Sequence, residues 1–182
     1  MRTLKIFTII LGLLLGLSLP AAADPAALFN TYFGKAQDGN VCFARTYDNA
    51  HLEKHPAQKV QIIEIDMTKD NASGKPNTPE SFDLGFGLKT ASSPDWYGQA
   101  AICKTEADTF SCFLQGDGGS FHLKPDGPNA LRLETGDYGI AIEGSKDALT
   151  LDGKSGDDKV FILIPSRSEC DAASAFFNTK NE

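Results

Sequence analysis

Apolar and polar residues alternate along most of the chain after residue 40, and this pattern predicts half-buried β-strands. The clearest run is Ser81–Thr90, in which every second residue is apolar: Phe82, Leu84, Phe86 and Leu88. Gly85 and Gly87 fall on the opposite face of this strand. Glycine inside a strand indicates that a neighbouring group packs closely there or that the strand bends.

Nine more segments have apolar residues two apart: Val41–Tyr47, Val60–Met67, Gln99–Lys104, Thr109–Gln115, Ser120–Lys124, Ala130–Glu134, Tyr138–Glu143, Ala148–Leu151 and Lys159–Ile164. The doublet Ile62-Ile63 shifts the alternation and predicts a β-bulge. About ten short strands, many at 8–12-residue spacing, predict a mainly all-β fold: a single small antiparallel β-barrel or sandwich of about 8–10 strands. Helical segments between the strands are missing, which excludes parallel crossover connections.

Both ends of the β-rich region predict short helices. Asp24 is a suitable cap for a helix that starts with proline at its first position. Near the end of the chain, Ser168–Asp171 resembles a capped helix start. We expect this second helix to run to about residue 177 and to dock three residues against an end of the barrel: Ala172, Phe176 and Phe177.

Residues 1–23 have the features of a cleaved secretory signal peptide. Two basic residues precede the apolar run Ile6–Leu19, and three alanines form a small-residue cleavage site before Asp24. The run is 14 residues long, whereas a membrane-spanning helix needs about 20. We therefore expect a bacterial-type periplasmic or secreted protein with one β-rich domain over residues 24–182 and no stable membrane anchor.

The four cysteines of an exported chain are expected to form two disulfides, for which three connectivities are possible. If residues 106–109 form a hairpin with a two-residue loop, Cys103 and Cys112 face each other at disulfide distance. Cys42 and Cys170 then pair and join the two ends of the domain. A zinc site fits these spacings less well, because no Cys-x-x-Cys occurs.

The chain is acidic, with 24 Asp and Glu residues against 17 Lys and Arg and a net charge of −7. Cleavage of the leader would remove two basic residues and leave a charge of −9. An acidic surface without a Lys/Arg cluster opposes nucleic acid and anionic lipid as partners.

The sequence contains no recognisable catalytic constellation, so we expect no enzyme activity and no cofactor. The Gly-x-Ser-x-Gly motif of many hydrolases is absent, and the cysteines are expected to be oxidised. His51 and His55 are four residues apart, but Glu53 lies midway between them, whereas the base of a zinc protease lies beside one histidine. His51, His55 and Asp158 are weak candidates for a metal site. Two exposed histidines on a polar turn are the stronger expectation, since no third ligand is indicated for His51 and His55.

Two sequence features are compatible with ligand or partner binding. Trp96 and Tyr97 fall in an expected loop that could present aromatic rings to a partner, although large aromatics more often plug a barrel end. Arg45 lies between Phe43 and Tyr47 on one strand face, where it could stack on the rings or cover the barrel rim.

The interior of a barrel of this size can hold one small ligand or be filled by side chains. Six phenylalanines are available to fill it: Phe82, Phe86, Phe110, Phe113, Phe121 and Phe161. The leading hypothesis is a non-enzymatic binding module that recognises a partner protein, as an inhibitor or accessory factor of envelope enzymes. The alternatives are a carrier of a small apolar ligand and, more distantly, a hydrolase of envelope polymers.

Overall fold

The structure is a computed structural model that describes residues 24–37, 41–144, 147–152 and 156–179. Its elements in chain order are α1 (Pro25–Phe33), the 3-10 turn η1 (Gly34–Gln37), β1 (Val41–Thr46), α2 (Asn49–Lys54), β2 (Val60–Met67), β3 (Phe82–Thr90), β4 (Trp96–Glu106), β5 (Thr109–Leu114), β6 (Gly119–Pro125), β7 (Leu131–Glu143), β8 (Ala148–Leu151), β9 (Val160–Pro165) and α3 (Ser168–Thr179). The expected signal peptide, residues 1–23, lies outside the described residues. Within the described ranges, the helices are too short or too polar to cross a membrane.

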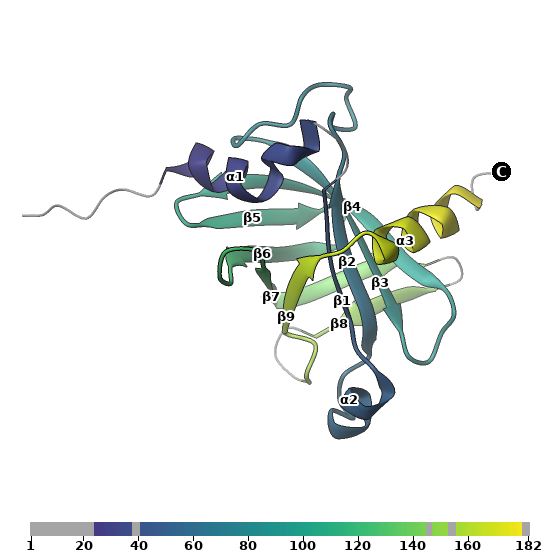
Figure 1. Cartoon of the computed structure of the whole chain (residues 1–182). Helices are drawn as coiled ribbons and strands as arrows, with labels where there is room; N and C mark the ends of the chain where they lie inside the picture. Colours follow the sequence, from purple (N-terminus) through teal and green to yellow (C-terminus); the bar gives the residue numbers. More distant parts are fainter. Residues whose placement is uncertain (1–23, 38–40, 145–146, 153–155, 180–182) are drawn as a thin grey trace, which may run out of the picture.

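Eight antiparallel strands form a closed barrel, which decides between the two architectures that the strand pattern allowed (Figure 1). Strands β1 to β6 pair in sequence order, the first half of β7 pairs with both β6 and β9, and β9 returns to β1. The second half of β7 forms a hairpin with β8. Closure leaves no free edge along the barrel wall itself.

Two strands expected from the sequence, Ala130–Glu134 and Tyr138–Glu143, are in fact one long strand, β7. Between them the pairing with β6 jumps from Thr135 to Ile140. Gly139 has a φ of 71° in this irregular stretch, a conformation that favours glycine. The turn residues therefore redirect the strand instead of ending it. The bulge expected in β2 is confirmed by a register shift between Val60 and Ile62.

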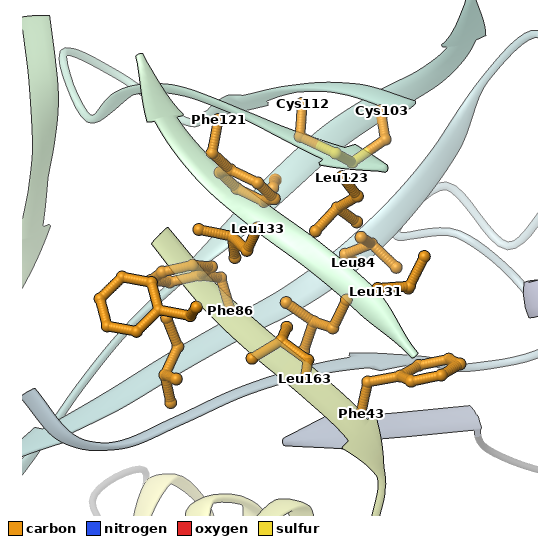
Figure 2. Close-up of a cluster of buried hydrophobic side chains, with 14 of the residues drawn as sticks. Phe43, Leu84, Phe86, Cys103, Cys112, Phe121, Leu123, Leu131, Leu133 and Leu163 are labelled. Atoms are coloured by element: carbon orange, nitrogen blue, oxygen red, sulfur yellow. A yellow bond between two sulfur atoms is a disulfide. The ribbon is translucent and has the colours of Figure 1, made fainter. Parts of the chain in front are cut away.

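Phenylalanine and leucine side chains fill the barrel interior (Figure 2). Five of the six phenylalanines expected there are at most 2% exposed: Phe82, Phe86, Phe110, Phe121 and Phe161. Their rings pack in tilted and edge-to-face pairs, such as Phe86 and Phe121 with centroids 5.1 Å apart. The sixth, Phe113, is 56% exposed. It lies next to the inward-facing Cys112 on β5, and alternation therefore turns it outward.

Both expected disulfides are confirmed. Cys103 and Cys112 are register partners across the β4–β5 hairpin, and their Cα atoms are 4.1 Å apart. Cys42 on β1 is bonded to Cys170 on α3 over a sequence separation of 128. Two disulfides indicate an oxidising, exported environment.

Helix α1 covers one end of the barrel. The Asp24 carboxylate accepts a hydrogen bond from the Ala26 amide at 3.0 Å and caps the helix as expected. The Phe33 ring, 1% exposed, packs against Phe43 and Phe110 at centroid distances of 6.1 and 5.1 Å. These contacts seal the interior at this end.

Helix α3 lies on the outer wall of the barrel, across β1 to β4, and not against its end as the sequence analysis expected (Figure 1). The reason is the disulfide, because Cys42 points outward from β1 and holds Cys170 on that face. Ala173 is 1% exposed and packs on the wall, whereas Ala172, expected to dock, is exposed.

Candidate functional site

Two carboxylates lie on the outer wall of the barrel beneath α3. Glu64 and Asp66 point outward from β2, because the inward positions of this strand are taken by the buried residues Ile63, Ile65 and Met67. Across the β2–β3 pairing, Glu64 faces Gly87 and Asp66 faces Gly85. Each carboxylate therefore lies beside a residue that has no side chain.

The glycines make room for these two carboxylates. A Cβ at Gly87 would stand well under 3.0 Å from Glu64 Oε1, and one at Gly85 equally close to Asp66 Oδ1. The close packing that the glycines of β3 predicted is thus confirmed, and the groups that pack there are the two acidic side chains. Gly98 on β4 gives similar room to the ring of Phe177.

Between α3 and the barrel wall lies a groove with a volume of about 260 Å³. Glu64 and Asp66 line it from β2, and the backbone of Gly85 and Gly98 lines it from β3 and β4. Phe177 contributes an aromatic wall from α3. This volume is sufficient for the charged head of one amino-acid side chain.

Burial changes the acid chemistry of both carboxyl groups. Glu64 is 3% exposed, and desolvation together with the neighbouring Asp66 charge raises its pKa to about 8. Desolvation also raises the pKa of Asp66, against the lowering effect of the Arg167 guanidinium. Glu64 is therefore mainly protonated at neutral pH when the groove holds no cation.

The contact between Glu64 and a disulfide sulfur also indicates that the Glu64 carboxyl group is protonated. Glu64 Oε2 lies 3.0 Å from Cys170 Sγ. A disulfide sulfur carries no proton, so the hydrogen bond requires a protonated carboxyl group that donates to the sulfur. Among the described residues, no group donates a hydrogen bond to a deprotonated Glu64.

An exposed apolar pair lies on the same wall. Ile102 on β4 and Phe113 on β5 are direct register partners and are 50% and 56% exposed. Ala100, which lines the groove, is the next outward-facing residue before Ile102 on β4. Residues two apart on a strand are about 7 Å apart, so the apolar pair begins where the groove ends.

The aromatic residues that the sequence suggested for binding are buried. Trp96 and Tyr97 belong to β4 and not to a loop, and they are 5% and 7% exposed. The Tyr97 hydroxyl donates to Asp147 Oδ1 at 3.1 Å. Both rings are therefore buried, which was the stronger expectation from the sequence for large aromatic side chains, and they are not presented to a partner.

Three other residues that the sequence suggested for binding or metal ligation lie on or near α2: Arg45, His51 and His55. The Arg45 guanidinium lies 5.3 Å from the centroid of the Tyr47 ring, and the His51 ring lies 4.6 Å from the same ring. His55 stacks on His51 at 4.3 Å, so the two histidines share a helix face as expected. His51 is hydrogen-bonded to Gln58 through Nε2 at 3.1 Å.

The third weak metal candidate, Asp158, has a structural role. Its carboxylate accepts hydrogen bonds from the backbone amides of Lys59 and Val60 at 2.7 and 3.1 Å. In the described ranges the residue group compatible with a metal ion is Cys42, Glu64 and Cys170. Both of its sulfur atoms are already joined to each other.

A serine, a histidine and a glutamate come together on the outer face of β4 to β6. Ser111 Oγ donates to Glu106 at 2.7 Å and lies 3.3 Å from His122 Nδ1. A catalytic triad requires the carboxylate on the histidine, with the serine reachable by substrate. Here the carboxylate contacts the serine itself, and Ser111 is 3% exposed.

A larger groove of about 450 Å³ lies between α1, β1 and the residues that follow β9. Its charged side chains, Lys35 and Arg167, are both exposed. The groove beneath α3 differs because a buried carboxyl group, that of Glu64, lines it, which makes it the better candidate for a specific site.

Comparisons of the chain with protein-family models, with curated proteins and with solved structures find no match. The molecule is thus defined by its own architecture: a closed eight-stranded antiparallel barrel with two disulfides and a helix on its outer wall.

Four residues were not among the site residues predicted from the sequence: Glu64, Asp66, Ile102 and Phe113. Ile102 and Phe113 each extend an apolar run, Ala101–Cys103 and Cys112–Leu114, at positions where alternation calls for a polar residue. This departure from alternation could have identified the two residues as an exposed apolar pair. The acidic pair carried no such signal, because an outward Glu or Asp on a strand is normally solvated.

Proposed function

We propose that this protein is a non-enzymatic binding module that recognises a partner protein through the outer face of β4 and β5. The observation that carries the proposal is the paired exposure of Ile102 and Phe113. An aromatic and an aliphatic side chain side by side on a rigid strand pair are suitable anchors for an interface core.

The rigidity of this face supports the proposal. The disulfide between Cys103 and Cys112 lies next to both residues in the same register and crosslinks the two strands. A preorganised surface loses little conformational entropy on association, so more of its contact energy appears as affinity.

The filled interior favours a partner protein over an apolar ligand. The phenylalanine rings of the core pack against one another and fill the interior. The ring centroids of Phe86 and Phe121, for example, are 5.1 Å apart. A carrier of this type needs a pocket of roughly 300 Å³ or more inside the barrel. The grooves described above lie on the outer surface instead.

For localisation, we propose that residues 1–23 direct export and that the mature protein acts in the periplasm or outside the cell. The partner is then another exported protein, in line with a role as inhibitor or accessory factor of an envelope enzyme. The two disulfides support this compartment.

Site-specific photo-crosslinking tests the proposed interface. A benzophenone group placed at Phe113 should give one discrete crosslinked product in the native exported fraction, and the added Ile102→Asp substitution should abolish it. The same group at Glu53, an exposed position on α2, is the matched control. The proposal fails if Phe113 gives no product, gives the same products as Glu53, or crosslinks only to a second copy of this chain.

A further inference from the structure

We infer that the groove beneath α3 binds a lysine or arginine side chain of the partner protein, whose neighbouring apolar side chain packs on Ile102 and Phe113. This inference deepens the proposed function and rests on it. It assigns a binding site to Glu64, Asp66 and Phe177 and specifies the chemistry of what they bind.

The groove is complementary in charge to a cation. The carboxyl groups of Glu64 and Asp66 line the groove. If Glu64 loses its proton, none of the described residues donates a hydrogen bond to it. A buried carboxylate without a donor is costly, so a cation with several N–H groups is the ligand that satisfies it best. A guanidinium or an ammonium group carries such donors and the compensating charge.

The shape of the walls also favours a cation. Gly85 and Gly98 line the groove beside the carboxylates, and the Phe177 ring packs over Gly98 as its aromatic wall. A cation that contacts both the carboxylates and this ring gains ion-pair and cation–π interactions together. A volume of about 260 Å³ admits one such head group but not a large ligand.

The groove is continuous with the apolar pair Ile102 and Phe113. Along β4 the outward-facing positions run from Ala100 in the groove to Ile102 beside Phe113. In an extended segment, side chains two residues apart point the same way with a spacing of about 7 Å. A partner strand or loop with a basic residue and an apolar residue two positions apart therefore matches both features.

Proton linkage is a distinctive consequence of this arrangement. A bound cation stabilises the charged form of Glu64, so binding at neutral pH must release its proton. With a pKa of about 8 in the unoccupied groove, the affinity for a permanent cation should rise about tenfold between pH 7 and pH 9. The neighbouring charge that acts on Glu64 is that of Asp66 on β2, and Arg167 before α3 acts in turn on Asp66; Arg167 also pairs with Asp171 at 3.7 Å.

The test uses Nα-acetyl-argininamide as the probe and its uncharged isostere Nα-acetyl-citrullinamide as the control, each titrated into the full mature chain by NMR. We expect the arginine probe to shift the amide signals of Gly85 and Gly98 with a dissociation constant on the order of 1 mM. The citrulline probe should leave them unchanged. Equal shifts from both probes, or shifts confined to other surfaces, would overturn the inference.

Variants give a second readout. Glu64→Gln keeps the shape of the side chain, and it should weaken arginine binding and reduce its pH dependence to the smaller part that the raised pKa of Asp66 leaves. Glu53→Gln on α2 should change neither. If Glu64→Gln does not fold, Asp66→Asn should weaken binding in the same direction, and unchanged binding in the folded variant contradicts the site.

The two hypotheses can fail separately. A discrete, Ile102-dependent crosslink at Phe113 without arginine binding would retain the partner-recognition function and reject the cationic groove. Arginine binding without that crosslink would retain the groove and reject the apolar pair as an interface.

Discussion

Glu64 lies against the backbone of Gly87, its register partner across β2 and β3, so closely that a single added methyl group would collide with its carboxyl group. An acidic side chain can be buried on an outer barrel wall because its neighbour has no side chain and α3 covers the pair.

Gly87→Ala should therefore destabilise the protein. The new methyl group must displace the buried Glu64 side chain, and such overpacking typically lowers the free energy of unfolding by about 1–3 kcal/mol. Urea denaturation followed by circular dichroism measures the change. In a Glu64→Ala background the same substitution should cost much less, because the colliding group is gone. Equal costs in both backgrounds would show that the collision is relieved without Glu64.

The stability of the protein should fall as the pH rises from about 5 to 8. The folded-state pKa of Glu64 is raised to about 8, whereas an unfolded Glu titrates near 4.3. Between these values the folded chain binds more protons, so the free energy of unfolding decreases by up to about 1.4 kcal/mol per pH unit.

Thermal unfolding as a function of pH measures this dependence. Glu64→Gln should flatten the decline, while the raised pKa of Asp66 leaves a smaller slope of the same sign. Glu53→Gln, on the exposed face of α2, is the control and should retain the full slope. A wild-type melting temperature that rises over this pH range would contradict the burial of an acidic proton at Glu64.

The two disulfides should contribute unequally to stability. Cys42 and Cys170 are 128 residues apart, against 9 for Cys103 and Cys112. In the chain-entropy model the long loop contributes about 5 kcal/mol and the short one about 3 kcal/mol. Paired Cys→Ala variants, compared by urea denaturation, should follow this order.

Loss of the long-loop disulfide should also release α3. Hydrogen exchange in residues 170–179 should accelerate in the Cys42→Ala/Cys170→Ala variant and stay unchanged in the hairpin variant. Protection of α3 that is equal in the two variants would mean that packing alone holds the helix on the barrel.

Phe113→Ala and Phe121→Ala should have very different effects on stability, although both remove a phenyl ring from the same pair of neighbouring strands. Phe113 is 56% exposed and should cost less than about 1 kcal/mol, whereas Phe121 is fully buried and should cost about 3–5 kcal/mol. Equilibrium denaturation of both variants checks the difference. A large loss at Phe113 would place its ring in the core and remove the basis for the proposed interface.

Local patterns were sufficient for much of the fold. The strict alternation in β3 predicted which residues face the interior, since successive side chains on a strand point to opposite faces. The hairpin of Cys103 and Cys112 could be predicted because a short loop sets the register of its two strands. The pairing of Cys42 with Cys170 followed from the two cysteines that remained.

Barrel closure, the position of α3 and the candidate site could not be predicted in this way. The sequence alone determined the inward and outward residues of the strands that alternate strictly, such as β3, because that choice depends on neighbours in the chain. Only the tertiary structure decided that Glu64 is buried, because the groups that cover it belong to a helix more than 100 residues later in the chain. Alternation assigns a side chain to a face, whereas burial on that face depends on which distant segment packs there.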